Sequence, residues 1–236
     1  MDDTEFDRIL LAEAFAAIAA EGWPRFSVAR PARAGGRALE RARLRFPSKA
    51  SVLIRFGRLA DAAALAGAPD EGAVRDRLFE MMMRRFDVMQ AHRAGIVALL
   101  RHIPFAPPLA ALLGCANLAS MRWLLEAAGV SARGPLGQLR AKGLLGVWLW
   151  AMRAWVGDES RDLSATMAAL DTALARAERA ARWAPDGSRH AGSAPDFPPS
   201  DDNPEAPSDD GDGTPPPPPA ADPAEDPGPG PVGTPP

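Results

Sequence analysis

The sequence has little cysteine and little histidine. One cysteine and three histidines occur among 236 residues, so no disulfide can close within the chain and no cysteine cluster can hold a metal ion. No Ser-His-Asp order, metal-ligand spacing or glycine-rich phosphate loop stands out. We therefore expect no catalytic residues, no metal site and no cofactor.

The single cysteine, Cys115, lies between Gly114 and Ala116 in an apolar run. That setting favours a small buried side chain over a reactive thiol. His92 and His102 both fall near the ends of a short expected helix, where capping or exposure to solvent is the simplest interpretation.

Signals for secretion or for a membrane span are also lacking. The chain begins MDDTEFDRIL, which is acidic where a signal peptide would be basic. The longest strongly apolar stretch, GLLGVWLWAMRAWVG, is interrupted by Arg153 and is shorter than the roughly 20 residues that a spanning helix needs. We expect a soluble, cytoplasmic protein.

Charge and proline are unevenly distributed along the chain. Residues 1–184 carry a net charge of +7, whereas residues 185–236 hold eleven acids, one arginine and seventeen of the 25 prolines, and carry −10. A segment with so few apolar side chains cannot bury enough surface to offset its chain entropy. We predict that 185–236 is a disordered tail with polyproline-II character, whose PPPPP run is either a solvated spacer or a docking segment.

Apolar residues in the rest of the chain recur with helical periodicity, and no convincing strand pattern appears. The first expected helix, around Ile9–Ile18, ends at Gly22. A second long helix starts after Ser48, an expected N-cap, and a third starts after Asp70. Further helices are expected over 93–103, 109–128, 136–156 and 163–183. The pattern predicts an all-α protein.

The stretch around Ser48 is strongly basic. Residues 25–58 contain ten basic residues and one acid, Glu40, which gives a net charge of +9. Such a patch attracts a polyanion such as duplex DNA, with an affinity that falls as salt rises. A solvated, arginine-rich surface is the alternative, because arginine supplies all but two of the basic residues in the whole chain.

Three segments of this region resemble the TetR family of transcriptional regulators: ILLAEAFAAIAAEGW (9–23), FSVA (26–29) and RFPSKASVLIRF (45–56). The resemblance implies a TetR-like helical bundle, with a helix-turn-helix domain over 1–60 and a larger ligand-binding and dimerising domain over 61–184. In that family a lysine at the position of Lys49 touches phosphate. Charge and resemblance together select these DNA-binding candidates: Arg30, Arg33, Arg37, Arg41, Arg43, Arg45 and Lys49.

The middle of the motif departs from the family pattern. Pro31 and Arg37 stand where the second helix and the turn carry apolar residues, and Ala42 and Arg43 stand where the recognition helix carries Leu and Tyr. A proline inside a short helix costs about 3 kcal/mol, and an arginine in a core costs more unless it reaches solvent. Phosphate contact is therefore better supported than base-specific reading.

The later helices are also similar to a second family with a TetR-like fold, the ubiquinone-biosynthesis accessory (COQ-nine) family, whose members bind lipids. The similar segments are VRDRLFEMMMRRFDVM (74–89), HRAGIVALLRH (92–102) and WVGDESRDLSATMAALDTAL (155–174). Two functions therefore stay open. One is a DNA-binding regulator controlled by a small apolar ligand, and the other is a lipid-binding accessory protein, in contact with lipid or a membrane surface, that has lost DNA reading.

Two groups of apolar residues are candidates for a ligand pocket and for a subunit interface. Met and Trp side chains suit irregular apolar ligands, which suggests a pocket of Met82, Phe86, Met89, Met121, Leu124 and Trp148. Ordinary core packing explains the same spacing. In the TetR family the last two helices pair subunits, so the resemblance places a homodimer interface on Met152, Trp155, Met167, Leu170 and Leu174.

Overall fold

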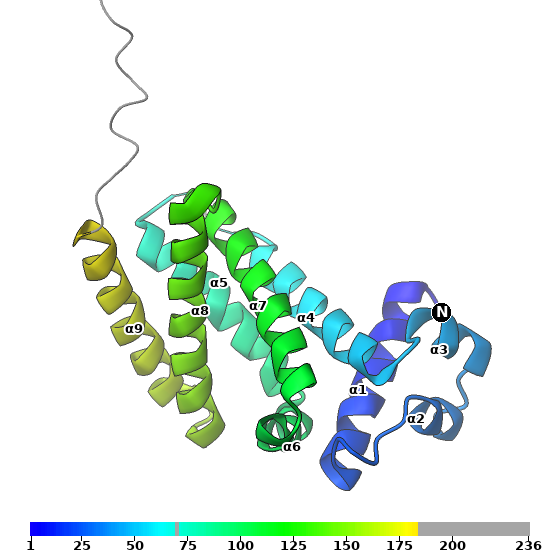
Figure 1. Cartoon of the computed structure of the whole chain (residues 1–236). Helices are drawn as coiled ribbons and strands as arrows, with labels where there is room; N and C mark the ends of the chain where they lie inside the picture. The colour runs from blue at the N-terminus through cyan, green and yellow to red at the C-terminus, as the bar shows by residue number, and fades with distance from the viewer. Residues whose placement is uncertain (69–70, 184–236) are drawn as a thin grey trace, which may run out of the picture. The chain divides into compact units, whose positions relative to one another are not determined.

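Every regular element in the described part of the chain is helical (Figure 1). The computed structural model describes residues 1–68 and 71–183. Its elements are α1 (Asp3–Glu21), α2 (Ala29–Ala34), α3 (Leu39–Arg45), α4 (Lys49–Leu65), α5 (Val74–Gln90), α6 (Arg93–His102), the 3-10 helix η1 (Ile103–Phe105), α7 (Pro107–Ala127), α8 (Gly134–Gly157) and α9 (Ser164–Trp183). The all-α prediction is confirmed. The expected tail, 185–236, lies outside the described residues.

Helix α1 supports the short helices α2 and α3. Asp2 caps it by accepting a hydrogen bond from the Thr4 N–H at 2.8 Å. Its buried face includes Leu10 and Ile18, as the periodicity predicts. The helix ends at Gly22, whose φ of 79° lies in the left-handed region that favours glycine.

Helix α4 joins this group to the remaining helices (Figure 1). Ser48 and Ser51 cap its start reciprocally, each side chain accepting from the backbone N–H of the other. Ser48 is therefore the N-cap that the sequence predicts. Helix α4 packs against α5 and α7. The predicted boundary at residue 60 falls inside α4, and α1 to α9 all belong to one compact unit.

Helices α5, α7, α8 and α9 share an apolar core that is rich in Met and Trp. The apolar stripe of α5 is buried as predicted, although the helix starts at Val74 after Ala73 and Asp70 lies outside the described residues. The Phe86 ring stacks on Trp148, with the ring centroids 4.6 Å apart. Helix α8 packs along α9 (Figure 1).

A buried aspartate holds the turn between α8 and α9. Asp158 accepts hydrogen bonds from the N–H and Oγ1 of Thr166 at 2.8 and 2.7 Å, and from Ser160. Burial alone would raise the pKa of Asp158, but the hydrogen bonds from Ser160 and Thr166 lower it well below its ordinary value. The turn then enters α9 through Leu163, which has a φ of 55°.

Helix α6 approaches α1 closely at a glycine. A Cβ atom on Gly95 would lie 2.3 Å from the carbonyl oxygen of Phe15, so only glycine allows this approach. Next to it, the His92 ring stacks on Phe15 at 5.4 Å and meets the edge of Phe56 at 5.5 Å. The expected capping or solvent role of His92 is wrong, because the ring is half-buried between α1 and α4.

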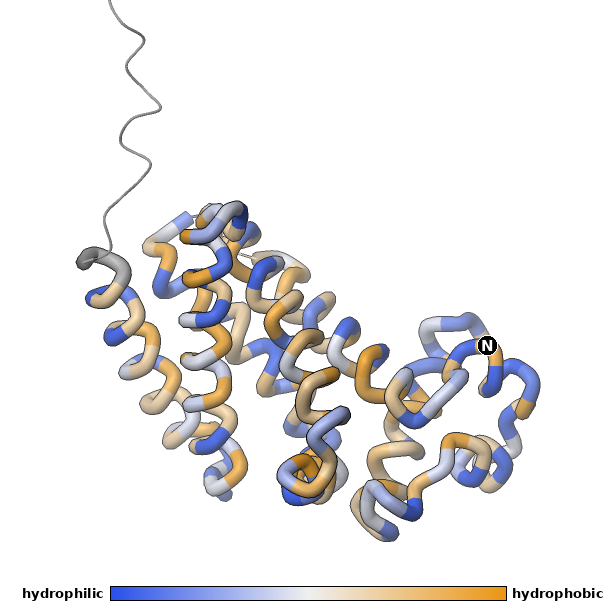
Figure 2. The backbone as a smooth tube through the Cα atoms, viewed as in Figure 1, coloured by the Kyte–Doolittle hydropathy of each residue, from blue (hydrophilic) through white to orange (hydrophobic). Residues whose placement is uncertain are grey.

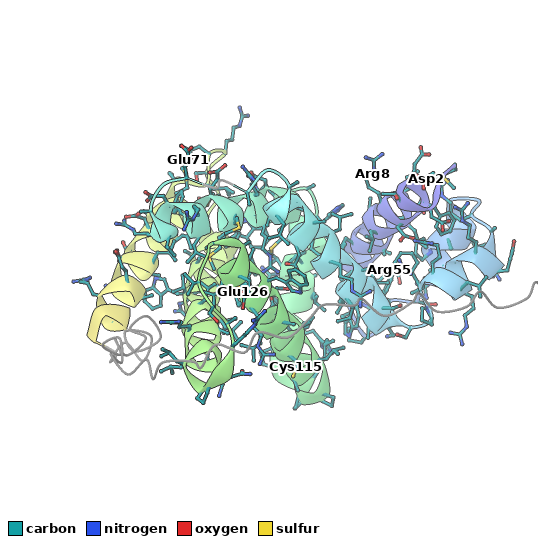
Figure 3. All side chains as sticks on the ribbon, turned by 90° about the horizontal axis from the view of Figure 1, so that it is seen from above. Asp2, Arg8, Arg55, Glu71, Cys115 and Glu126 are labelled. Carbon is teal, nitrogen blue, oxygen red and sulfur yellow. The ribbon has the colours of Figure 1, made fainter. Side chains whose placement is uncertain are left out.

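One further expectation about an apolar segment is wrong. Cys115 is exposed on α7 rather than buried (Figure 3). In addition, α7 rather than the run in α8 is the one described helix long and apolar enough to cross a membrane by length and composition, with a mean hydropathy of 1.3. Only 22% of that apolar stretch is buried. Figure 2 shows the apolar character of α7.

Candidate nucleic-acid interface

Helices α2 and α3 form a helix-turn-helix, and its departures from the family pattern are accommodated. Pro31 is the third residue of α2, where a backbone N–H has no intrahelical partner in any case. The penalty expected for a proline inside a helix therefore does not apply. In the turn, a Cβ atom on Gly35 would lie 2.5 Å from Oε1 of Glu13, and Gly36 has a φ of 64°. The positive φ of Gly36 favours glycine there, whereas a side chain at position 35 would displace the Glu13 carboxylate.

Carboxylates of α1 hold the outer arginines of this motif. Arg37 donates to Oε1 of Glu13 at 3.0 Å, so the guanidinium that replaces an apolar turn residue reaches a carboxylate and does not enter a core. Arg30, before the turn, pairs with Glu21 at the other end of α1. Both arginines were predicted to contact DNA, and both are engaged within the chain.

Two aspartates of α1 organise the arginines of α3 and α4. Asp3 pairs with Arg41 and Arg45, and the hydrogen bond from Arg41 lowers the pKa of Asp3 below its ordinary value. Asp7 pairs with Arg45 and, at 2.7 Å, with Arg55 of α4. The hydrogen bond with Asp7 raises the pKa of Arg45. These ion pairs connect three helices, α1, α3 and α4, and α3 itself buries only the small side chain of Ala42.

The other three DNA-binding candidates do not pair with a carboxylate in the described part of the chain. Arg33 and Arg43 are exposed. Lys49 donates to the backbone carbonyls of Trp23 and Pro24 at 3.3 and 3.0 Å. None of the three forms an ion pair within the described residues.

The net charge of the whole motif is smaller than its basic stretch predicts. Residues 1–24 contain six acids and one arginine, so the +9 of residues 25–58 becomes +4 for residues 1–58. Four of these acids, Asp3, Asp7, Glu13 and Glu21, pair with arginines of α2, the turn, α3 and α4, and so oppose their charge directly. The charge of a sequence window could not reveal this pairing.

A hollow of about 400 Å³ lies between α2, α3 and the start of α4. Ala42 is the one buried residue of α3, and its methyl group is too small to fill this space. The apolar side chains that line the hollow are Phe26, Val28, Ala29, Leu39, Ala42, Phe46 and Pro47. Arg43 and Lys49 line it as well.

A larger hollow of about 850 Å³ lies between α5 and α9. The lining of this larger hollow is acidic, whereas the lining of the hollow between α2, α3 and α4 is basic. Apart from Arg161, its charged lining residues are Asp76, Glu80, Asp87, Asp162 and Asp171.

The residues predicted to form a ligand pocket are buried in the core. Met82, Phe86, Met121 and Leu124 are fully buried, and Met89 and Trp148 are nearly so. None of these six residues lines either hollow. Their arrangement is that of ordinary core packing.

Sequence reasoning missed a buried arginine in this core. The Arg85 guanidinium lies 4.5 Å from the centroid of the Trp148 ring, its Nε is 3.4 Å from Oδ1 of Asp61, and it donates to Asn117 at 3.3 Å. Burial lowers the pKa of Arg85, and the nearby Asp61 opposes that shift. The signal was present in the sequence, because Arg85 lies three residues after Met82 on the apolar face of α5.

The residues predicted to form a dimer interface lie mostly in the core of the single chain. Trp155 and Leu170 are fully buried, and Met152 and Leu174 are nearly so, because α8 and α9 turn their apolar stripes toward each other. Met167 lines the larger hollow. The prediction of an exposed interface at these residues is therefore wrong. The exposed apolar residues of α8 are instead Leu139, Leu149, Trp150 and Val156.

No protein-family model and no curated protein matches the sequence. Among solved structures, the TetR transcriptional regulator from Nitrosomonas europaea ATCC 19718 matches with a TM-score of 0.61 and 17% identity, over 74% of this chain and 99% of that chain. The chain has a TetR-like fold. Salmonella enterica GusR matches with a TM-score of 0.49 and 19% identity, over 76% of this chain and 98% of that chain.

The TetR-like fold agrees with the order of elements that the sequence resemblance implies. Helices α1 to α3 correspond to the expected helix-turn-helix, and α5 to α9 make up the larger helical region. The fold prediction is confirmed. Whether the chain contacts DNA depends on its own side chains. Carboxylates of α1 form ion pairs with four of the seven residues predicted to bind DNA.

Proposed function

We propose that this protein is a TetR-like transcriptional regulator that binds duplex DNA, works as a homodimer in the cytoplasm and responds to a small ligand. One observation supports the proposal above all: α3 follows a tight turn after α2, with Arg33 and Arg43 exposed and Lys49 at the start of α4. In a helix-turn-helix the second helix enters the major groove. Cations beside it hold phosphates and fix the orientation of the protein on DNA.

The α1 carboxylates weaken this interface without abolishing it. Ion pairs that are open to solvent contribute only about 0–1 kcal/mol. The pair between Arg41 and Asp3 is of this kind, since both side chains are substantially exposed. Arg41 can therefore exchange its carboxylate for a DNA phosphate at small cost. We expect modest, salt-sensitive affinity in which phosphate contacts dominate.

The test is fluorescence anisotropy of the full-length protein with a duplex from its own upstream region and a scrambled duplex of equal composition. Lys49→Ala and Arg43→Ala should each weaken binding and reduce the dependence on salt by about one phosphate contact. Arg161→Ala, in the turn before α9, is the matched control and should leave both unchanged. Identical salt dependence in all four proteins would contradict DNA binding by this motif.

The homodimer is proposed from the exposed apolar face of α8. Leu139 is 62% exposed and Trp150 is 53% exposed, and Gly143 and Gly146 leave open space between them along the helix. Soluble monomers rarely expose large continuous apolar patches, and symmetric two-fold pairing is the commonest way to cover one.

Lipid binding is a second candidate function, and the exposed face of α7 favours it. Trp123 is 68% exposed, and Phe105, just before α7, is 82% exposed. Residues 93–157 contain seven basic residues and one acid, Glu126. Exposed aromatic side chains beside positive charge suit a helix that lies on an anionic lipid surface. Co-sedimentation with phosphatidylglycerol vesicles, compared with phosphatidylcholine vesicles, tests this candidate, and Trp123→Glu should abolish any binding.

A further inference from the structure

We propose that the hollow between α2, α3 and α4 binds a compact amphiphilic carboxylate, such as a medium-chain fatty acid. The site lies inside the helix-turn-helix and is separate from the Met- and Trp-rich core of α5, α7 and α8. Binding itself does not depend on the proposed function, whereas the effect of binding on DNA rests on it.

The walls of the hollow suit an apolar body. Phe26 and Phe46 supply aromatic surface, and Val28 and Leu39 supply aliphatic surface, around a space of about 400 Å³. This volume is at the lower end of the range for small-molecule sites, which are largely apolar with a few placed polar groups. The occupant is therefore small and mainly hydrocarbon.

The charged groups of the hollow select an anion. Lys49 and Arg43 line it, and no carboxylate does. An ammonium group has three N–H donors, and Lys49 uses two of them on the carbonyls of Trp23 and Pro24. The third donor remains for a ligand carboxylate. The larger hollow between α5 and α9, with its five carboxylates, would repel the same ligand.

The space exists because α3 has a small residue at its one buried position. The resemblance to TetR-family regulators places Leu and Tyr where Ala42 and Arg43 stand. An apolar space left unfilled lowers the stability of a fold, and a ligand that binds only the folded protein raises stability by mass action. A hydrocarbon chain in this space would support α3 in place of the missing side chains.

Binding here would act directly on DNA recognition. Lys49 is the residue whose position matches a phosphate-contacting lysine, and it also lines the hollow. A carboxylate held by Lys49 would occupy the donor that a phosphate needs. The ligand would therefore compete with DNA at the interface itself, without a conformational signal from the larger helical region.

Titration calorimetry on the full-length protein tests the site with decanoate, kept below its micelle-forming concentration. We expect saturable binding of decanoate, at least tenfold weaker binding of the neutral decan-1-ol, and no binding of decyltrimethylammonium at this site. Nuclear Overhauser contacts from the decanoate chain to the rings of Phe26 and Phe46 would locate it. Absence of saturable binding, or equal binding of the cationic amphiphile, would overturn the proposal.

Two variants with the same substitution, Ala to Leu, distinguish loss of binding caused by filling the hollow from loss caused by adding a leucine elsewhere in the motif. Ala42→Leu places a larger side chain in the hollow and should remove decanoate binding, whereas Ala34→Leu, at an exposed position of α2, should leave it unchanged. Lys49→Gln should weaken decanoate about tenfold and decan-1-ol little, because it removes one charged hydrogen bond. Lys49→Gln keeps the test decisive if Ala42→Leu does not fold. Decanoate binding to folded Ala42→Leu at wild-type affinity would contradict the site.

The effect on DNA is a separate measurement. Where wild-type protein binds duplex DNA, saturating decanoate should weaken that binding at least tenfold, and Ala42→Leu should be insensitive to it. If decanoate binds in the hollow and no DNA binds under any condition, the ligand site stands and the regulator proposal fails. If DNA binds and decanoate does not, the regulator proposal stands and the ligand site fails.

Discussion

At the scale of single residues, Asp3 controls how much arginine charge α3 offers to DNA. Its carboxylate pairs with both Arg41 and Arg45. Asp3→Asn should therefore strengthen DNA binding a few-fold at low salt and increase the salt dependence by about one phosphate contact. Glu5→Gln removes an equal charge from α1 at a position without an ion pair in the described chain. An equal gain from Glu5→Gln would contradict release of these arginines.

Arg85 and Asp61 form a buried pair whose two members should respond differently to replacement. Removing either member of a buried ion pair leaves the other charge uncompensated, and the cost is larger when the remaining charge is the more deeply buried one. The Arg85 side chain is 5% exposed, whereas the Asp61 side chain is 22% exposed. We expect Arg85→Met to change the free energy of unfolding by less than about 1 kcal/mol, and Asp61→Ala to lower it by about 2–3 kcal/mol. Urea unfolding followed by circular dichroism measures both, and equal losses would contradict this asymmetry.

The sequence predicts which residues are charged but not which charges meet. The basic character of residues 25–58 and the role of Ser48 follow from local pattern. The pairing of Arg45 with Asp7 joins residues 38 apart, and only the packing of α3 on α1 creates it. The hollow beside Ala42 also could not be predicted from the sequence. A small side chain leaves a space only if the neighbouring side chains do not fill it, and that depends on how the helices pack.

At the scale of elements, the contact of α6 with α1 and α4 should make stability depend on pH through His92. Burial lowers the pKa of His92 below its ordinary value. The folded protein therefore binds fewer protons than the unfolded chain below about pH 7, and the free energy of unfolding should fall as pH drops from about 7 to 5. His92→Phe keeps an aromatic ring between Phe15 and Phe56 and should flatten this decline.

His102→Gln is the control for that experiment, because His102 lies at the other end of α6. Chemical unfolding at several pH values measures the slopes. Carboxylates such as Asp3, whose pKa is lowered, change the free energy of unfolding at more acidic pH than His92 does. A decline in His92→Phe that is as steep as in the wild type would assign the pH dependence to other groups.

The extent of each helix was predictable where caps and periodicity agree. Ser48 before α4 and Gly22 after α1 mark ends that the structure reproduces. The buried face was not predictable in α7, which is apolar nearly all round, and the exposed Cys115 illustrates the error. In α8, two tryptophans on different faces have different surroundings. Trp155 is buried against α5 and donates a hydrogen bond from its indole N–H to Gln90, whereas Trp150 is exposed.

At the scale of the whole molecule, the fold was predictable because three short motifs near the N-terminus carry the TetR-family resemblance. The binding partners were not predictable from the fold. Proteins that share a fold can bind different partners, because function depends on the surfaces that each protein presents. Two such surfaces are distinct here: the exposed apolar face of α8 and the exposed apolar face of α7.

Residues 185–236 carry a net charge of −10 and should compete with DNA for the basic surface. Truncation after Ala184 should strengthen DNA binding at low salt and lose that advantage at high salt, because the competition is electrostatic. The thermal midpoint should stay within about 2 °C of the wild-type value, as expected for a tail with few apolar side chains. A fall of many degrees would show that the tail packs on the helical part.

Pairing of two copies through the α8 face is tested by charge substitution at positions that are exposed in the single chain. Leu139→Glu with Trp150→Glu should yield a folded monomer, because neither side chain belongs to the core. Analytical ultracentrifugation at micromolar concentration measures the change, and DNA binding should fall sharply because a single half-site is held weakly. The matched control, Leu112→Glu with Trp123→Glu on α7, should remain a dimer and keep DNA binding. Wild-type protein that is monomeric and binds anionic vesicles through α7 would contradict the regulator and favour the lipid-binding candidate.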